Sequence, residues 1–464
     1  MITIFYRKDV LNLEKQSSNM GTEKIGKLMA QLSIPSIIAQ LINVLYNIID
    51  RMYVGHIPEV GANALTGLGV SAPIILIVSA FSMFISGGGA PLAAIALGRD
   101  DKEESERIVS TSVVLLTIIS IILTILILIF KEPLLYLFGA SDITFPYANE
   151  YTTIYIFGTI FVQYALGLNL FISSQGKAKI AMFSVLIGAV TNIILDPIFI
   201  FGFNLGVSGA AIATVISQAL SAFFVLYYLS SKRSIFRIKK EYLKLDLRIA
   251  KRCISLGVSP FIMQITESAI IIVFNNMLLK YGGDLYVGAL TIMQSVMQLL
   301  VVPVIGFTNG IQPIISYNYG AKKYDRVLKT ERLTIKIAFG VTTAYFILVY
   351  LFPHIFARVF TSEKDLFDLV SKNLPIYMGG MWLFGVQLAA QTFFVGTGQA
   401  LKSLLIASLR KVFILIPLAI ILPRFFGVLG IYYSEPIADI ISASVSGIIL
   451  FINMRQLKAL SNSF

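Results

Sequence analysis

The sequence has few of the residues on which most enzyme active sites and metal centres depend. Of its 464 residues, one is cysteine and two are histidine. The lone Cys253 excludes a disulfide within the chain and a cysteine-based metal site. His56 and His354 stand far apart, so hydrolase or metalloprotease chemistry has no histidine cluster to use. We therefore expect no enzymatic activity and no cofactor.

Charged residues are also scarce. They make up 13% of the chain, against 56% hydrophobic residues and a mean hydropathy of +0.82. This is too little polar material to cover a soluble globule of this length, so lipid must cover much of the surface. The first 21 residues are polar and lack the apolar region of a cleaved signal peptide, so we expect the first apolar run to direct membrane insertion.

Long apolar runs recur along the whole chain and predict membrane-spanning helices. Six lie in each half, so the fold predicted is an all-α polytopic membrane protein with twelve transmembrane helices. The runs cover residues 29–50, 64–86, 108–130, 151–173, 180–202, 207–230, 253–279, 287–309, 334–353, 374–396, 404–423 and 428–452.

The two halves repeat one another. Pro35 and Ala64-Leu65-Thr66 return 225 positions later, and Gly88, Gly98 and Gly158 return 222 positions later. An even number of spans per half inserts both copies in the same direction, which predicts two parallel six-helix repeats around a central cavity, an arrangement typical of secondary transporters. The predicted divisions are an N-terminal extension (1–24), a first six-helix half (25–231), a basic linker (232–252), a second half (253–455) and a tail (456–464).

The formal net charge of +12 could suggest a nucleic-acid partner, but its distribution favours another reading. With both termini placed in the cytoplasm, most Lys and Arg residues fall in cytoplasmic segments, and the densest run is the linker 232–252. Such asymmetry fixes membrane orientation and attracts anionic headgroups. We expect a monomeric multi-pass protein of a prokaryotic inner (plasma) membrane, with the lipid bilayer as partner and no nucleic acid.

Ionisable groups inside spans are costly and are functional candidates by default. From the helical rise, Asp196 and Thr214 should lie at one depth near the external surface, with Asn192 one turn below Asp196 and Asp50 toward the same side. These oxygens predict a site for H⁺ or for Na⁺, and the residues alone do not choose between them. The structural alternatives are a bond between Asp196 and Asn192 alone, and a local ion pair between Asp50 and Arg51.

The second half offers one deep acid, Glu267, which could attract a cationic substrate or carry a coupling proton. Its alternative is a buried, hydrogen-bonded glutamic acid. Amides and methionines nearby suit a cavity that accepts varied apolar cations. The candidates for this cavity, or for a secondary coupling site, are Glu267, Asn275, Gln294, Gln298 and Gln387.

In several motifs the chain resembles the multidrug and toxic compound extrusion (MATE) family. The resemblance covers nearly everything from Lys24 to Arg455, and its motifs keep the order of the two halves. They are Asp50 to Gly55, Gly98 with the charged loop 99–107, Ser174 to Lys177, Asn192 to Pro197, Gly209 to Thr214, Gly310 to Pro313, Tyr319 to Lys322, and Gly396 to Gly398.

The resemblance implies a secondary active exporter of lipophilic organic cations and other small amphipathic compounds, driven by inward H⁺ or Na⁺ through rocking of the two halves. The motifs are most similar to the DinF-type and archaeal branch, whose cation site implies the same role here for Asp50, Asn192, Asp196 and Thr214, with a tyrosine matched by Tyr151. In the NorM-like branch this role falls to a glutamate that Glu267 resembles. The acid that accompanies it has no counterpart between Pro375 and Gly396, so the first half is favoured for coupling.

The alternative function is a flippase for a lipid-linked oligosaccharide, from the same superfamily. Its cavity should be strongly basic to hold a pyrophosphate. The predicted spans offer mainly acids and amides, with Arg51 as the chief exception.

Overall fold

The computed structural model of the protein describes residues 20–361 and 363–461, and this part of the chain is helical and contains no strand. Ten of its helices are long and apolar enough to cross a membrane, and two bent helix pairs bring the number of candidate spans to twelve. The predicted fold class is confirmed. Residues 1–19 of the predicted extension and residues 462–464 of the predicted tail lie outside the described part.

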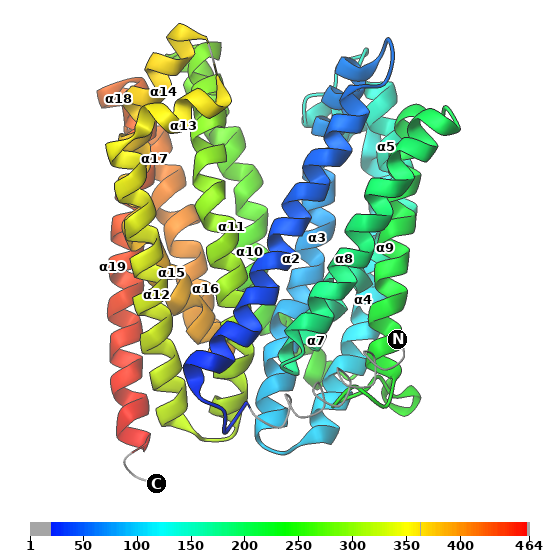
Figure 1. The fold of residues 1–464 in the computed structure, drawn as a ribbon, viewed down its shortest axis with the longest axis vertical. Helices are drawn as coiled ribbons and strands as arrows, with labels where there is room; N and C mark the ends of the chain where they lie inside the picture. The colour runs from blue at the N-terminus through cyan, green and yellow to red at the C-terminus, as the bar shows by residue number, and fades with distance from the viewer. Residues whose placement is uncertain (1–19, 362, 462–464) are drawn as a thin grey trace, which may run out of the picture.

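The first set of six spans extends from α2 to α9 (Figure 1). Its helices are α2 (Ile25–Gly55), α3 (Gly61–Gly98), α4 (Lys102–Leu137), α5 (Phe145–Phe157), α6 (Thr159–Gln163), η1 (Tyr164–Leu168), α7 (Asn169–Ser174), α8 (Ala178–Pro197), η2 (Ile198–Gly202) and α9 (Gly206–Ser230).

The second set follows a short helix in the linker, η3 (Lys240–Tyr242). It comprises α10 (Leu247–Tyr281), α11 (Asp284–Gly320), α12 (Tyr324–Leu351), α13 (Pro353–Phe360), α14 (Lys364–Tyr377), α15 (Met381–Gly396), α16 (Ala400–Ser408), η4 (Leu409–Leu415), α17 (Ile416–Ile421), α18 (Pro423–Phe426) and α19 (Val428–Ser461).

Most helices extend beyond the predicted apolar runs, because backbone hydrogen bonding continues into polar residues that a hydropathy pattern does not mark. α10 shows this most clearly. Its first residue is Leu247, and the Asp246 side chain caps it by accepting hydrogen bonds from the backbone N–H groups of Arg248 and Ile249. Residues 247–252, predicted as linker, therefore belong to the helix.

Each set contains one span that bends at a glycine. α5 meets the helix that follows it at 63° next to Gly158, and α14 meets α15 at 50° next to Gly380. A Cβ atom would lie 2.6 Å from Val215 at the first position and 2.4 Å from the Cβ of Asp439 at the second. Only glycine permits this approach to α9 and α19. The predictions of one helix over 151–173 and one over 374–396 are thus corrected to two helices each.

The segment 231–246 between the sets is fastened to the first set. Gln175 accepts a hydrogen bond from the backbone N–H of Ile235 at 2.8 Å, and Phe236 is fully buried. Lys239 lies 2.7 Å from Glu106 of α4, and this hydrogen-bonded carboxylate raises the pKa of Lys239. Some of the linker's positive charge therefore serves internal pairing as well as the predicted attraction to headgroups.

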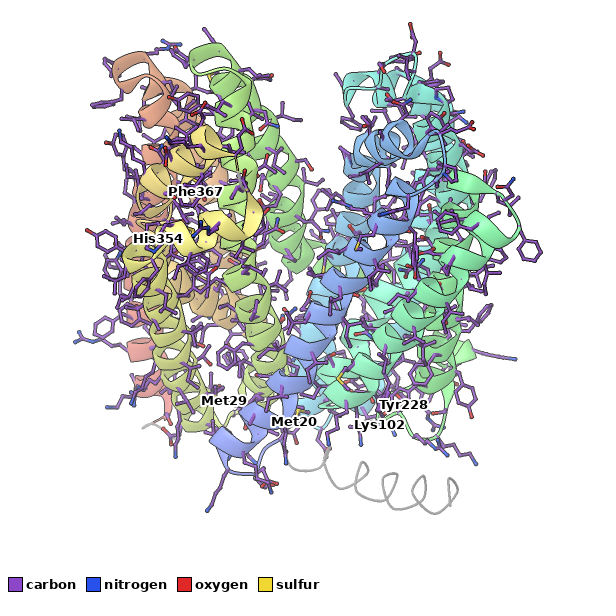
Figure 2. The ribbon with its side chains drawn as sticks, turned by 45° about the horizontal axis from the view of Figure 1, so that its top comes forward. Met20, Met29, Lys102, Tyr228, His354 and Phe367 are labelled. Carbon is purple, nitrogen blue, oxygen red and sulfur yellow. The ribbon has the colours of Figure 1, made fainter. Side chains whose placement is uncertain are left out.

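The two sets join at only one end of the bundle, the end at which α2 begins and segment 231–246 connects α9 to α10. We call it the linker end. Of the four buried hydrophobic clusters, the two at the linker end combine residues of both sets, whereas the other two each lie within one set. Figure 1 shows the sets side by side at the linker end and splayed apart at the other. Figure 2 labels Met20, Lys102 and Tyr228 near the linker end and His354 and Phe367 toward the opposite end.

Candidate functional site

Two helices of the first set bring three predicted site residues together in its interior. Asn192 and Asp196 lie one turn apart on α8, and the Asn192 amide donates to Asp196 Oδ1 at 3.1 Å. The same amide lies 3.4 Å from Thr214 Oγ1 on α9. Asn192 and Asp196 are buried, with 1% and 0% of their surface exposed. Asn192 thus connects Asp196 on α8 with Thr214 on α9.

Asp50 approaches this group from α2. Its side chain is buried and lies within hydrogen-bonding reach of Asp196. Two carboxylates this close repel one another unless a positive charge neutralises one of them. Three buried oxygens here, one each from Asp50, Asn192 and Asp196, have no partner in the described part of the chain. The group can therefore hold a proton between its acids, or a hard cation such as Na⁺, which prefers oxygen ligands.

The two structural alternatives, an Asn192–Asp196 bond and an Asp50–Arg51 ion pair, do not account for all the carboxylate oxygens of these acids. The bond between Asn192 and Asp196 exists, but it leaves the second carboxylate oxygen of Asp196 unpaired. Across residues 20–361 and 363–461, no ion pair joins Asp50 to Arg51. Asp50 and Asp196 therefore each keep one buried carboxylate oxygen without a hydrogen-bond partner among the described residues.

Tyrosines complete the group. The bend at Gly158 places α5 beside α9, so that the buried Tyr151 lies close to Thr214. Tyr151 also stacks on Tyr155, with 6.2 Å between ring centroids. Sequence reasoning missed Tyr46, which lies one turn before Asp50 on α2 and lines a small cavity with Asn192 and Thr214. The spacing of four residues between Tyr46 and Asp50 could have revealed it.

Two cavities adjoin the group. The smaller, of about 30 Å³, reaches Asn192 and Thr214 and has room for a water molecule or a monatomic cation. The larger, of about 230 Å³, lies between the sets, since its lining includes Gln264 of α10 and Asn309 of α11. Asn43 lines both cavities. Asn43 therefore lies between the space next to Asn192 and Thr214 and the larger space between the sets.

The second set contains an ionic cluster that the sequence analysis missed. Arg410 pairs with Glu435 and, at 2.5 Å, with Asp439 of α19, and all three side chains are buried. Lys411 pairs with Glu267 of α10 and donates to the Met263 carbonyl at 2.7 Å. The statement that Arg51 is the chief basic residue of the spans is therefore wrong. The Arg-Lys pair inside the apolar run 404–423 was the available signal.

The other predicted cavity residues lie apart from this cluster. Asn275 lies three turns beyond Gln264 on the same face of α10, and Gln298 lies three turns before Asn309 on α11, close to one face with Gln294. Gln387 is buried inside the second set and accepts a hydrogen bond from Ser442 at 3.2 Å. The amides therefore do not form a single group.

Comparison with known proteins gives a consistent result across both sets. A family model described as MatE matches residues 35–198 and 260–421, one stretch in each set. The chain is similar to the multidrug export protein MepA of Staphylococcus haemolyticus (strain JCSC1435), with 26% identity over 92% of this chain and 93% of that protein. The corresponding protein of Staphylococcus aureus (strain MSSA476) is 25% identical with the same coverage.

Solved structures share the fold. A crystal structure of MATE in the bent conformation superimposes with a TM-score of 0.90 at 24% identity, covering 96% of this chain and 99% of that one. A structure described as the outward-facing conformation of a multidrug resistance MATE family transporter of the MOP superfamily gives 0.88 at the same identity and coverage.

Proposed function

Because the chain belongs to the MatE family, we propose that it is a secondary active multidrug exporter that expels lipophilic organic cations in exchange for inward H⁺ or Na⁺. As a member of this family it is a transporter and not an enzyme. The observation that carries the proposal is the buried pair of Asp50 and Asp196, with unpaired oxygens, beside a cavity between the two sets. Coupling is assigned to the first set, because its acids lack the basic partners that the acids of the second set have.

The proposed orientation places the linker end in the cytoplasm of a prokaryotic cell, with the protein acting as a monomer. The basic residues of segment 231–246 favour the inner side of a membrane. The structure then has its two sets closed toward the cytoplasm and splayed toward the outside. In this state a cation from outside reaches Asp50 and Asp196 and displaces the exported compound, and rocking of the sets returns the site inward.

The gradient of the coupling ion supplies the driving force. Exchange of one inward H⁺ or Na⁺ for one outward organic monocation moves no net charge, so the membrane potential, worth about 2.3 kcal/mol per elementary charge per 100 mV, cancels between the two ions. At this stoichiometry a tenfold inward ion gradient, about 1.4 kcal/mol, supports roughly a tenfold gradient of the exported cation. A proton suits the close approach of the two carboxylates, and Na⁺ suits the oxygens of Asp50, Asn192, Asp196 and Thr214.

The flippase alternative is less well supported. Arg410 and Lys411 add positive charge to the second set, but three acids, Glu267, Glu435 and Asp439, oppose them. A pyrophosphate would require an excess of positive charge that this cluster does not have.

Ethidium export from proteoliposomes tests the proposed function. Vesicles are loaded with ethidium and given either an inward pH gradient or an inward Na⁺ gradient. We expect one gradient to drive export and the other to have little effect, which would name the coupling ion. Absence of export of any tested cation under both gradients would contradict the proposal.

Tyr151→Phe tests whether the tyrosine beside Thr214 contributes to binding of the coupling ion. The substitution removes the hydroxyl that Tyr151 presents to Thr214, where it can hydrogen-bond when the ion is bound, and keeps the stacked ring. A single hydrogen bond is worth about 1 kcal/mol, so we expect the concentration of coupling ion for half-maximal export to rise by roughly fivefold. Tyr147→Phe, one turn earlier on α5, is the control and should leave this concentration unchanged.

A further inference from the structure

The two buried cations of the second set differ in what surrounds their partners. Arg410 pairs only with fully enclosed acids, since Glu435 and Asp439 side chains are 4% and 0% exposed. Lys411 is itself 6% exposed, but its partner Glu267 is 55% exposed. The ion pairs of Arg410 are therefore buried on both sides, whereas the ion pair of Lys411 has an exposed acidic partner.

The internal repeat shows which residues of the first set correspond to Arg410 and its two acidic partners. Gly188 of the first set corresponds to Arg410, 222 positions later, while Thr214 and Gln218 correspond to Glu435 and Asp439, 221 positions later. Gly188, Thr214 and Gln218 all line the small cavity of the first set. Arg410, Glu435 and Asp439 therefore stand at the positions of the second set that correspond to lining residues of that cavity in the first set. A fixed internal cation occupies a position that the first set leaves open.

Glu267 lies at the boundary between the second set and the space between the sets. Gln264, one turn before it on α10, donates to Ser79 of α3 at 2.8 Å and lines the cavity of about 230 Å³. Glu267 and Ile271, three and seven residues after Gln264, continue this side of α10 beyond the cavity lining, and they are 55% and 40% exposed. The Glu267 side chain is thus exposed one turn beyond the part of α10 that lines the cavity between the sets.

The charges of the cluster favour a cationic ligand. Two basic and three acidic side chains lie together, so the ionised cluster carries one excess negative charge. Arg410 and Lys411 are neighbours in sequence and repel one another. A ligand cation can take the place of Lys411 at Glu267, because the displaced ammonium keeps a second acceptor in the Met263 carbonyl.

We propose that Glu267 binds the charged group of a lipophilic organic monocation, and that Lys411 is a tethered competitor which occupies Glu267 when the ligand leaves. The inference rests on the proposed function and deepens it, because it assigns the substrate's charge to the second set and the coupling ion to the first. Return of Lys411 to Glu267 lowers affinity for the departing compound, so that the chain itself assists release.

Binding of tetraphenylphosphonium to the purified full-length protein in detergent tests this assignment. For Lys411→Met we expect binding to tighten by about tenfold, because the competing ammonium is gone. For Glu267→Gln we expect a loss of about tenfold. Neutral triphenylphosphine oxide should bind all variants equally. Lys402→Met is the matched control, with wild-type affinity expected. It removes a lysine of α16, the helix before the η4 segment that carries Lys411, and Lys402 bonds Gln399 and Asn453.

The binding results distinguish a failure of the role proposed for Lys411 from a failure of the proposed exporter function. Unchanged or weaker tetraphenylphosphonium binding by Lys411→Met, with wild-type binding intact, would overturn the tethered competitor and leave the exporter standing. An equal gain for the neutral compound would also overturn it, since it would indicate added apolar space. Wild-type protein that binds no organic cation would overturn both. The melting temperatures of all variants identify any that are misfolded. If Lys411→Met is misfolded, Lys411→Gln is used in its place.

Discussion

Asp196→Asn is expected to abolish ion-driven export while leaving the protein folded. Asparagine keeps the size of the side chain and can still accept the hydrogen bond from Asn192, but it removes the negative charge that a coupling ion needs. The outward gradient of ethidium that the coupling-ion gradient supports should fall to none. Ethidium efflux from proteoliposomes, under the gradient that drives the wild type, measures this loss.

The double variant sharpens the test of this site. Asp50 and Asp196 share one positive charge in the proposed mechanism, so they act as a unit, and Asp50→Asn with Asp196→Asn should be no worse than either single variant. Asp142→Asn removes an acid outside the spans and should export at the wild-type rate. Undiminished export by Asp196→Asn would instead move coupling out of the first set. Glu331 would then be the acid to examine, since it is fully buried and both its oxygens lack partners in the described residues.

Much of this site could be predicted from the sequence because helical geometry is regular. Counting the rise per residue from the ends of apolar runs predicted that Asp196 and Thr214 lie at one depth, and in the structure the Asn192 amide lies within 3.4 Å of an oxygen of each. The repeat offsets likewise placed Gly158 and Gly380 at equivalent positions, which proved to be the two bends. Residue spacing along one helix, or between the two repeats, is enough for predictions of this kind, and the neighbouring helices need not be known.

What could not be predicted depends on contacts between helices distant in sequence. Arg410 and Lys411 lie inside an apolar run, where their charges look unfavourable until Glu435, Asp439 and Glu267 are brought to them from α19 and α10. The shape of the two bent spans depends on how closely α9 and α19 approach each glycine. A single sequence shows that Gly158 is present, but it does not show that its neighbour lies within reach.

Glycines also explain how the sets close at the linker end. A Cβ atom at Gly88 of α3 would lie 2.0 Å from the Cys253 carbonyl oxygen of α10, and one at its repeat equivalent, Gly310 of α11, would lie 2.4 Å from the Cα of Ser33 on α2. Such backbone contacts require small residues. Backbone carbonyls just before α2 add to this closure, since Gly21 accepts a hydrogen bond from Lys323 at 3.0 Å. The linker end is therefore closed by two similar backbone contacts and by the hydrogen bond from Lys323 to Gly21.

Gly310→Val should consequently trap the transporter open toward the cytoplasm and eliminate export. The added side chain overlaps the α2 backbone when the linker end is closed, so the closed arrangement is disfavoured as a whole. Cys253, the chain's single cysteine, is fully buried at the other contact and reports on this change. We expect maleimide labelling of Cys253 to accelerate in Gly310→Val, although residue 310 contacts a different helix. Gly340→Val, where no atom lies within 4 Å of the added Cβ, is the matched control. If Gly310→Val lost export without faster labelling, the two contacts would open independently, and closure by a single rocking motion would be refuted.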